Sequence, residues 1–453
     1  MAFNLESFCP EAWSQIEIGM AGDFSICCLA NNDDDFGIAR DDNDRPMNIM
    51  THSIQEALNS KTHKEQRLQL SRNEKPKRCR NCYDAEYSSR NKSKRQRVLK
   101  TTAPQIPEYI TIESAPRHTN LETGEVTSKI VNMHIRFGNL CNLKCIMCSP
   151  QHSNMWYEDW LALDYPQYEG EPIFKLGKYT SYEIKKDEHN RYRLGFNKWW
   201  ETERWWNQFR EIMPQLRYLY FTGGEPFLVP ALDTCLDMLI AADLAKHITL
   251  RFDTNLSIIN KKILDKLKLF KDVALCVSID ETNERFEFVR FPAKYDTFIK
   301  NLETLIENKI RIEYISSCIG NASMYAVPRV VAVANKYRLR LNFRFLEGPK
   351  WLDLRILPST AKQEIIDKFK EFKVRDAAQV MRMQHYDMMI LLLEKYIAPE
   401  HTNVTLLEEY VRCMDILDIQ RGTDWRVTLD EEYDLLSRHI PTLKNLRKQD
   451  GSY

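Results

Sequence analysis

The chain has 453 residues, and its 64 Lys and Arg residues balance its 64 Asp and Glu residues, so the formal net charge is zero. This length predicts two or three domains, and the balanced charge does not indicate a nucleic acid or a membrane as partner. Because no apolar run approaches about 18 residues and residues 1–6 lack the basic start and apolar stretch of a signal peptide, we expect a cytoplasmic chain without a membrane span.

The twelve cysteines fall into groups. Five precede residue 83, three lie between residues 141 and 148, and four are single. In a reducing compartment such cysteines are poor candidates for disulfides and better candidates for metal ligands. The single ones have apolar neighbours, and we expect them to be buried structural thiols: Cys235, Cys276, Cys318 and Cys413.

Residues 1–100 are predicted to fold as a small cysteine-rich module. A Gly-Asp pair indicates a hairpin turn, and a helical stretch separates this hairpin from Cys79-Arg80-Asn81-Cys82. A cysteine, a hairpin that ends in a cysteine, a helix and a closing C-x2-C can enclose one metal centre. Cys27 and Cys28 compete for one ligand position, because neighbours on a strand point to opposite faces and only one of them can face the metal centre. A structural zinc site with the same ligands is the alternative to an iron–sulfur centre.

Two blocks of charge flank this module. Residues 33–44 carry six aspartates, which we interpret as a solvated loop, and residues 61–100 carry 14 Lys and Arg against four Asp and Glu. We interpret the basic run at residues 90–97 as an exposed linker or helix. The alternative is a docking surface for an acidic peptide or for RNA. Aromatic side chains that stack on bases are sparse there, which argues against nucleic acid.

Residues 101–131 form a proline-containing connector, and from residue 132 onward predicted strands and helices alternate. This alternation is the pattern of βα units with a parallel sheet. The predicted strands cover residues 131–137, 216–221, 247–253, 273–279, 311–317 and 340–345. The predicted helices cover residues 230–246, 259–269, 293–309 and 326–337. Six such units are enough for a partial (β/α)6 barrel.

An aromatic-rich insertion, residues 151–215, lies between the first two units. Its tryptophans have helical spacing, so we expect a packed helical cap, which is also a candidate lid or substrate wall. After residue 350 the apolar residues again follow helical spacing. Residues 351–453 are therefore predicted to form a helical C-terminal region.

Two short motifs carry the chemistry. Cys141, Cys145 and Cys148 follow the first strand with the spacing C-x3-C-x2-C, and Gly223-Gly224-Glu225-Pro226 follows the second strand. Three thiolates on one loop can hold three irons of a cubic 4Fe–4S cluster and leave the fourth iron open to a small molecule. The alternative is a zinc knuckle, which usually has four ligands in two pairs.

The two motifs, in this order, resemble those of the radical S-adenosylmethionine (SAM) enzymes. The resemblance implies an α/β fold with a partial (β/α)6 TIM-like barrel over residues 132–350, a 4Fe–4S cluster on the three cysteines, and SAM. Residues 1–100 resemble the SPASM/twitch module, which holds an auxiliary 4Fe–4S cluster and here precedes the barrel. The implied auxiliary ligands are Cys9, Cys27, Cys79 and Cys82, with Cys28 as the alternative to Cys27.

The resemblance also implies residues that contact SAM. Gly223 and Gly224 let the backbone approach the methionyl amine because they lack a Cβ, and Glu225 orients that region. Arg290 is implied to face the SAM carboxylate, for which a guanidinium is well suited. The other implied contacts are Met147 with the adenine, Ser278 and Asp280 with the ribose, and Asn255 and Asn321 near strand ends. A helix N-cap is the alternative role for Ser278 or Asp280, and a surface ion pair for Arg290.

By resemblance the chain cleaves SAM reductively to a 5′-deoxyadenosyl radical, which abstracts hydrogen from an unactivated carbon. We expect a radical SAM oxidoreductase or maturase that modifies or cross-links side chains of a peptide or protein, assisted by the auxiliary cluster. A reductase such as flavodoxin or ferredoxin is the expected electron donor. The alternatives are dehydrogenation or rearrangement of a small molecule, and a non-catalytic iron–sulfur scaffold. The intact Gly223-Gly224-Glu225 turn argues against the scaffold.

Overall fold

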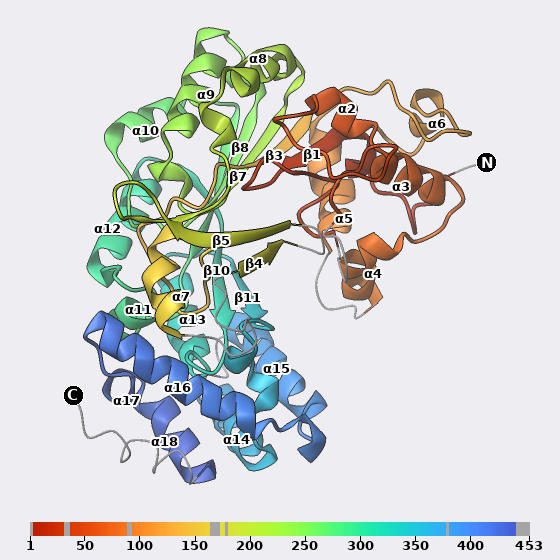
Figure 1. The fold of residues 1–453 in the computed structure, drawn as a ribbon. Coiled ribbons are helices and arrows are strands. Elements are labelled where there is room, and N and C mark those ends of the chain that lie inside the picture. Colours follow the sequence, from red (N-terminus) through yellow and green to blue (C-terminus); the bar gives the residue numbers. More distant parts are fainter. Residues whose placement is uncertain are drawn as a thin grey trace. The chain divides into compact units, whose positions relative to one another are not determined.

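Figure 1 shows the computed structural model of the chain, which describes residues 3–30, 37–87, 93–163, 173–176, 180–376 and 380–440. The chain divides into two compact units. The first unit comprises Met1–Cys141, Glu171–Asp253 and Asn260–Ala274, and the second comprises Asn142–Gly170, Thr254–Ile259 and Leu275–Tyr453. None of the helices in the described ranges has the length and apolarity needed to span a membrane.

An eight-stranded, mostly parallel sheet confirms the predicted α/β fold. The strand order is β11-β10-β9-β8-β7-β3-β1-β2. The strands are β1 (Gln15–Ile18), β2 (Phe24–Ser25), β3 (Asn132–Arg136), β7 (Tyr218–Thr222), β8 (Thr249–Thr254), β9 (Asp272–Ser278), β10 (Arg311–Ile319) and β11 (Leu341–Phe345). The six strands from β3 to β11 are those predicted from the sequence, and they are neighbours in chain order, as in a partial barrel.

Strand β1 of the N-terminal module extends this sheet, which the sequence did not predict. It pairs in parallel with β3, so that Glu17 lies beside His134, and in antiparallel with β2. Strand β3 in turn pairs in parallel with β7, and β7 with β8 (Figure 1). The cysteine-rich module and the start of the barrel therefore share one hydrogen-bonded sheet within the first unit.

Neighbouring strands of this unit align an apolar row and a polar row. Phe221 lies beside Phe252, both are buried, and their rings stack with centroids 5.4 Å apart. One residue earlier, His134 lies beside Tyr220, and Tyr220 beside Arg251. Because successive side chains of a strand point to opposite faces, the aromatic row packs one face of the sheet and the polar row lies on the other.

Helices follow the strands where the sequence predicted them. They are α9 (Pro230–Ala241), α10 (Lys261–Leu267), α12 (Tyr295–Glu307) and α13 (Ala326–Lys336), and the short helix α11 (Asn283–Val289) precedes α12. In α13, Val327, Val330, Val331 and Ala334 are buried, which is the i, i+3, i+4, i+7 stripe of a helix packed on a core. Asn260 caps α10 by accepting a hydrogen bond from the backbone N–H of Ile263 at 2.9 Å.

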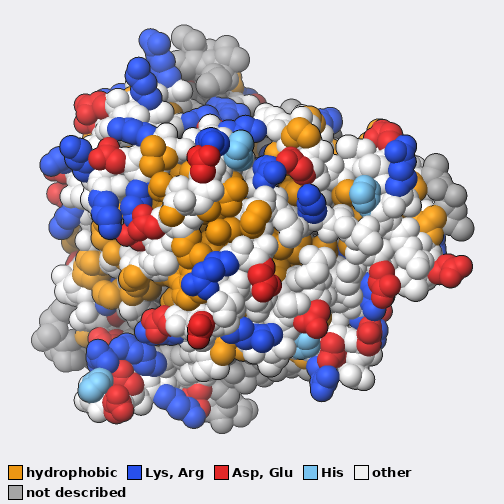
Figure 2. Space-filling view, turned by 90° about the horizontal axis from the view of Figure 1, so that it is seen from above, with side chains coloured by type: hydrophobic (Ala, Val, Ile, Leu, Met, Phe, Trp, Pro, Cys, Tyr) orange, Lys and Arg blue, Asp and Glu red, His pale blue; other side chains and the backbone are white. Residues whose placement is uncertain are grey.

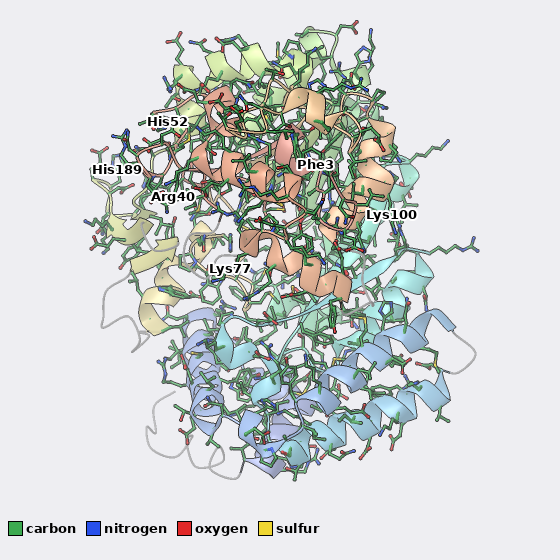
Figure 3. The ribbon with its side chains drawn as sticks, turned by 90° about the vertical axis from the view of Figure 1, so that its right-hand side faces the viewer. Phe3, Arg40, His52, Lys77, Lys100 and His189 are labelled. Carbon is green, nitrogen blue, oxygen red and sulfur yellow. The ribbon has the colours of Figure 1, made fainter. Side chains whose placement is uncertain are left out.

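Short helices build the N-terminal module. They are α1 (Glu11–Ser14), α2 (Ile54–Leu58), α3 (Lys61–Ser71), α4 (Arg80–Tyr87) and α5 (Lys94–Arg97), and α6 (Ala115–His118) follows in the connector. Ser53 and Glu56 form a capping box at the start of α2. Phe3, labelled in Figure 3, packs edge-on against Trp13 with ring centroids 5.3 Å apart. The module therefore has its own aromatic core.

The fully buried side chain of Arg67 joins separate segments of this module. Its guanidinium donates hydrogen bonds to the carbonyl oxygens of Gly124 at 2.7 Å, Ala12 at 2.8 Å and Leu58 at 3.0 Å. Three segments that are distant in sequence thus depend on one buried cation.

The insertion at residues 151–215 is only partly the predicted helical cap. It contains α7 (Tyr157–Leu163) and α8 (Glu203–Ile212), but between them lies an antiparallel sheet of β4 (Ile173–Leu176), β5 (Thr180–Lys186) and β6 (Tyr192–Leu194). The tryptophans pack as predicted. Trp199 and Trp205 are fully buried, and Trp199 Nε1 donates to the carbonyl oxygen of Met20 at 3.1 Å.

The described part of the basic run at residues 90–97 includes the helix α5 (Lys94–Arg97), in agreement with the predicted helix, but its residues are buried or half-buried rather than exposed. Residues 90–92 lie outside the described residues, but Arg95 is buried. Its guanidinium forms an ion pair with Glu86 and donates to the carbonyl oxygens of Leu5 at 2.7 Å and Phe8 at 2.9 Å. Figure 2 shows one face on which basic and acidic side chains are interspersed. Arg95 is therefore an internal contact of the module and not part of an exposed basic surface.

The C-terminal region is helical, as predicted. Its helices are α14 (Ser359–Arg375), α15 (Val380–Lys395), α16 (Val404–Arg421), α17 (Trp425–Thr428) and α18 (Asp430–His439). Residues 441–453 and the aspartates at positions 33–35 lie outside the described residues. Met389 on α15 is buried, in agreement with the helical spacing of the apolar residues in this region.

We predict that Arg67→Ala destabilises the N-terminal module by about 3–5 kcal/mol, because several buried carbonyl groups lose their donor and each such loss costs roughly 1–3 kcal/mol without full additivity. Hydrogen exchange measured by mass spectrometry reports the opening free energy of the amides of α3. Arg72→Ala, at the exposed C-cap of the same helix, is the matched control and should change this free energy by less than about 0.5 kcal/mol. Unchanged protection of α3 in Arg67→Ala would contradict the assignment.

Candidate active site

The Gly-Gly turn after β7 lies against the backbone that leads to Cys141, within the first unit. A Cβ at Gly224 would lie 2.1 Å from the carbonyl oxygen of Leu140, and Gly223 has a φ of +128°. The N–H of Glu225 donates to the same Leu140 oxygen at 2.8 Å. Only glycine fits this close approach, so the turn and the start of the cysteine loop hold each other in place.

The Glu225 side chain is fully buried in this turn. Its Oε1 accepts a hydrogen bond from the N–H of Phe227 at 3.3 Å, which caps the short 3-10 helix Pro226–Leu228. The sequence motif therefore forms a compact turn with a fixed carboxylate at the carboxyl end of β7, where reactive groups of βα barrels gather.

Within the second unit, the rest of the cysteine loop pairs with the segment around Arg290. The N–H of Lys144 donates to the Phe291 oxygen at 2.7 Å, and the N–H of Ile146 donates to the Val289 oxygen at 2.9 Å. Trp156 Nε1 donates to the Cys145 carbonyl oxygen at 2.9 Å. The loop that carries Cys145 is thus fixed on both sides.

Arg290 and Asp280 form a buried ion pair with 2.6 Å between Nη2 and Oδ2. Asp280 also accepts a hydrogen bond from the N–H of Cys318 at 2.6 Å. Burial raises the pKa of Asp280 and Arg290 acts to lower it. Burial likewise raises the pKa of the Cys145 thiol, and Arg290 is the largest influence that lowers it. Two of the residues implied to contact SAM therefore lie together, close to Cys145.

The other implied SAM contacts have different surroundings. Asn255 Nδ2 donates to Oδ1 of Asn142 in the cysteine loop at 3.2 Å. Asn321 is fully buried and donates to the Trp351 oxygen at 2.8 Å, which gives it a structural role. Ser278, at the end of β9, and Met147 are half-buried. Asn255 thus supports the cysteine loop, and the assignment of each residue to SAM stays a prediction.

Cys318 differs from the other three single cysteines. Cys235, Cys276 and Cys413 are buried as expected, whereas Cys318 is half-buried at the end of β10. Burial and then the neighbouring Asp280 raise its pKa to about 12, and Arg290 acts in the opposite direction. Its thiol therefore belongs to the surroundings of the Asp280–Arg290 pair rather than to the apolar core.

In the N-terminal module, Cys9, Cys79 and Cys82 influence one another electrostatically. Burial, followed by Glu11 and then by the Cys79 and Cys82 thiols, raises the pKa of Cys9. Cys79 Sγ accepts a hydrogen bond from Gln66 Nε2 at 3.3 Å. All three thiols are half-buried, and none of the three forms a disulfide. The three thiols are therefore close enough to affect one another's pKa, and their role as auxiliary ligands stays a prediction.

Lys94 links this group to the Cys27–Cys28 pair. Its Nζ lies 2.9 Å from Glu11 Oε2, 3.3 Å from Cys27 Sγ and 3.6 Å from Cys28 Sγ. Burial lowers the pKa of Lys94, but Cys27, Cys28 and Glu11 together raise it well above its usual value. Both candidate thiols lie near one cation, so this contact does not choose between them.

Sequence reasoning missed Lys94, Glu17 and His134. His134 Nδ1 lies 3.3 Å from Glu17 Oε1, and Nε2 is hydrogen-bonded to Thr222 Oγ1 at 2.6 Å. Burial lowers the pKa of His134, but Glu17 and Cys28 raise it to about 9. The sequence did contain a signal for His134. Polar and apolar residues alternate in β3, and this pattern is typical of a strand with one polar face.

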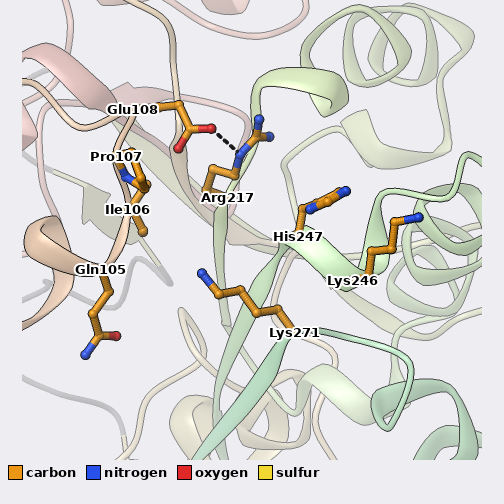
Figure 4. A pocket seen from close by; sticks show the side chains of 8 residues that line it. All are labelled: Gln105, Ile106, Pro107, Glu108, Arg217, Lys246, His247 and Lys271. Atoms are coloured by element: carbon orange, nitrogen blue, oxygen red, sulfur yellow. Dashed lines mark hydrogen bonds and ion pairs between the residues drawn. The ribbon is translucent and has the colours of Figure 1, made fainter.

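A pocket of about 260 Å³ lies away from these groups, at the other end of the strands (Figure 4). Its lining residues are Gln105, Ile106, Pro107, Glu108, Arg217, Lys246, His247 and Lys271. Arg217 precedes β7, His247 precedes β8 and Lys271 precedes β9, so the pocket is at the amino ends of the strands. The Arg217–Glu108 ion pair of 2.7 Å crosses it. Conserved chemistry in βα barrels lies at the opposite end.

Comparisons with protein families agree with both cysteine sets. The model of the radical SAM superfamily matches residues 135–321, which include the three-cysteine loop and the Gly-Gly-Glu-Pro turn. The SPASM model, described as an iron–sulfur cluster-binding domain, matches residues 9–83. Residues 135–321 are therefore a radical SAM domain, and residues 9–83 are a SPASM domain that precedes it. Its cofactors are SAM and 4Fe–4S clusters. No curated protein matches the chain.

Solved structures show only a distant likeness. Native anSMEcpe with bound AdoMet is 14% identical, with 56% of this chain and 63% of that chain covered and a TM-score of 0.36. Streptococcus suis SuiB bound to precursor peptide SuiA is 14% identical, with 59% and 51% covered and a TM-score of 0.35. The radical SAM methyltransferase TsrM from Kitasatospora setae, with cobalamin and a 4Fe–4S cluster bound, is 12% identical, with 48% and 37% covered and a TM-score of 0.31. The matched part spans less than two thirds of each of these chains.

The residues present fit the implied cofactors. The cysteines are thiols and not disulfides, and thiolates are the donors that iron–sulfur clusters require. The close contact of Gly224 with the Leu140 backbone holds the start of the three-cysteine loop against the Gly-Gly turn. The expected holders are Cys141, Cys145 and Cys148 for the cluster that binds SAM, and Cys9, Cys79, Cys82 and one of the Cys27–Cys28 pair for the auxiliary cluster.

We predict that Gly224→Ala lowers the iron bound at the three-cysteine loop at least several-fold, because its Cβ would lie 2.1 Å from the Leu140 oxygen and must displace the loop before Cys141. Iron and sulfide analysis after anaerobic reconstitution measures this, in a background that lacks the auxiliary cysteines. Gly195→Ala is the matched control, since its Cβ would have no neighbour closer than 3.7 Å. Equal iron in the two variants would show that the close approach does not support the loop.

We further predict that Lys94→Met lowers the midpoint potential of the auxiliary cluster. A cation 3.3 Å from a ligand sulfur favours the more negative, reduced cluster, and hydrogen bonds to the sulfurs tune such potentials. A redox titration followed by electron paramagnetic resonance measures the shift in a Cys141/Cys145/Cys148→Ala background. Lys100→Met, an exposed lysine close in sequence, should leave the potential unchanged (Figure 3). An identical potential in both variants would place Lys94 away from the cluster.

Proposed function

We propose that this enzyme abstracts a hydrogen atom from a peptide or protein and thereby oxidises or cross-links its side chains, with the help of the auxiliary cluster. The observation that carries the proposal is the presence of a radical SAM match and a SPASM match in one chain. When bound, the cluster and SAM supply a 5′-deoxyadenosyl radical. A second cluster site supports an oxidative outcome, since it offers a place for the electron that remains on the substrate.

The proposed task of the protein residues is to bind and orient SAM. Gly223 and Gly224 would accept the methionyl group, because backbone without a Cβ can approach it closely. Arg290 would turn one edge of its guanidinium to the SAM carboxylate while Asp280 holds the other edge, as their 2.6 Å ion pair suggests. This assigns Asp280 to positioning Arg290, rather than to the ribose contact expected from the resemblance.

The β4-β5-β6 sheet supports a peptide substrate. In the described part of the chain it ends on β4 and β6, which pair only with β5, so each has one free edge. An extended peptide can add to such an edge through backbone hydrogen bonds, with little demand on its side chains. We infer that β4 or β6 is the place where a peptide segment binds.

We also propose an electron donor, a cellular compartment and functional boundaries for the chain. Flavodoxin or ferredoxin would deliver the electrons, and the reducing cytoplasm would keep the free thiols competent for cluster assembly. The functional boundaries would be residues 1–100 for the auxiliary module, 101–131 for the connector, 132–350 for the barrel and 351–453 for the helical region.

The experiment that tests the radical chemistry compares the wild type with the Cys141/Cys145/Cys148→Ala variant. Both are reconstituted anaerobically and given SAM and dithionite. We expect 5′-deoxyadenosine from the wild type and at least a hundred-fold less, on the order of background, from the variant. Chromatography with mass spectrometry quantifies it. A wild type that binds iron but forms no 5′-deoxyadenosine, with or without candidate substrates, would favour the scaffold.

The substrate class needs a separate measurement. Peptides encoded next to the gene are made with deuterium in their side chains and added to the reaction. Transfer of deuterium into 5′-deoxyadenosine is expected for a true substrate, because the radical takes the hydrogen directly. Turnover of small molecules with no deuterium transfer from any peptide would contradict the peptide proposal while leaving the radical chemistry intact.

A further inference from the structure

Three side chains of different chemistry converge in the first unit, beside the auxiliary cysteines. One ligand atom from each of Glu17, Cys28 and His134 lies within 4.8 Å of the other two. Glu17 and His134 are buried and each is 4% exposed, whereas Cys28 is exposed. Carboxylate, thiolate and imidazole are the three side-chain ligands of zinc and related divalent cations.

The sheet itself produces this convergence. Strands β1 and β3 are parallel neighbours, and their register places Glu17 directly beside His134. Side chains at such paired positions point to the same face. Cys28 arrives from the segment after β2, which pairs with β1 in antiparallel. Three separate segments thus deliver one potential ligand each.

The spacing of the two buried ligands suits a tetrahedral cation. His134 Nδ1 and Glu17 Oε1 are 3.3 Å apart. Two ligands bound at about 2.0–2.1 Å at a tetrahedral angle are roughly 3.3–3.4 Å apart. The pair therefore needs no rearrangement, and a cation could enter from the side of the exposed Cys28.

The histidine is oriented as a metal ligand is. Nε2 is hydrogen-bonded to Thr222 Oγ1 at 2.6 Å, and with Nε2 as the donor the lone pair of Nδ1 points towards Glu17. Tyr220 stacks on the imidazole with centroids 4.3 Å apart, and its hydroxyl donates to Asp253 at 2.6 Å. Ligating histidines usually have such a partner on the second nitrogen, which fixes the tautomer and the ring.

A plain ion pair between Glu17 and His134 is the competing explanation. It leaves Glu17 Oε2 buried without a hydrogen-bond partner. A buried carboxylate oxygen in that state is unfavourable, and a bound cation would satisfy it. An ion pair between Glu17 and His134 also does not explain why the thiol of Cys28 lies beside them.

We propose that Glu17, Cys28 and His134 form a mononuclear site for a divalent cation of the zinc class, with a fourth position left open for an exogenous ligand. The site is separate from the auxiliary cluster, which then takes Cys27 as its fourth thiolate. Three protein ligands and one open position are typical of zinc sites that bind a substrate or water. The inference does not depend on SAM cleavage.

Zinc is the probe, because its X-ray absorption edge is separate from that of cluster iron. The full chain, loaded anaerobically with iron and sulfide, is incubated with Zn²⁺ and desalted. We expect about one zinc per chain, with one sulfur near 2.3 Å and nitrogen or oxygen ligands near about 2.0–2.1 Å. Cys28→Ser, Glu17→Gln and His134→Gln should each weaken zinc binding at least ten-fold at unchanged iron content. Cys235→Ser, a buried thiol elsewhere in this unit, should bind zinc as the wild type does.

Three results would overturn the proposal. Zinc bound no better by the wild type than by Cys28→Ser would leave the ion pair as the explanation. An all-sulfur zinc environment would mean that zinc occupies an unfilled cluster site. Loss of one cluster of iron in Cys28→Ser but not in Cys27→Ser would make Cys28 the cluster ligand. The near-isosteric Glu17→Gln variant guards against misfolding, and iron content reports the fold of the module in every sample.

Discussion

The parallel pairing of β1 with β3 is the constraint on which the first unit depends. It makes a strand of the N-terminal module a member of the barrel sheet and sets Glu17 beside His134. Strand β3 also pairs with β7, so the two loops that follow them begin at one edge of the sheet. The approach of Gly224 to Leu140 is a consequence of that pairing. Strand register thus positions the turn, the first cysteine and the polar face together.

A half-buried or buried cation accompanies cysteines in each of the two units. Lys94 contacts Cys27 and Cys28 in the N-terminal module, and Arg290 is the largest charged influence on the pKa of Cys145. Thiolates and the clusters that they hold are anionic, and a buried anion is costly without a compensating charge. Each cation is itself paired with a carboxylate, Lys94 with Glu11 and Arg290 with Asp280. Charge compensation is therefore built into the fold before any cofactor binds.

Much of the architecture was predictable because its signals are local. The strands and helices from β3 to β11 follow from alternating apolar patterns, and the C-x3-C-x2-C and Gly-Gly-Glu-Pro motifs are contiguous. The predictions failed where distant partners decide the outcome. Arg95 looked like part of an exposed basic run, but Glu86 and two backbone carbonyls bury it. The insertion has tryptophans at helical spacing, yet a small antiparallel sheet lies between its helices.

The sequence by itself determined the class of chemistry, since ligand type and spacing on one loop specify a three-thiolate cluster site without reference to the rest of the chain. It also determined the alternation of strands and helices, because hydrophobic periodicity is a property of neighbouring residues. Only the tertiary structure decided that Lys94 contacts both Cys27 and Cys28, that Asp280 holds Arg290, and that Glu17 meets His134. These contacts join residues that are far apart in sequence, and strand order and register, which no local pattern encodes, bring them together.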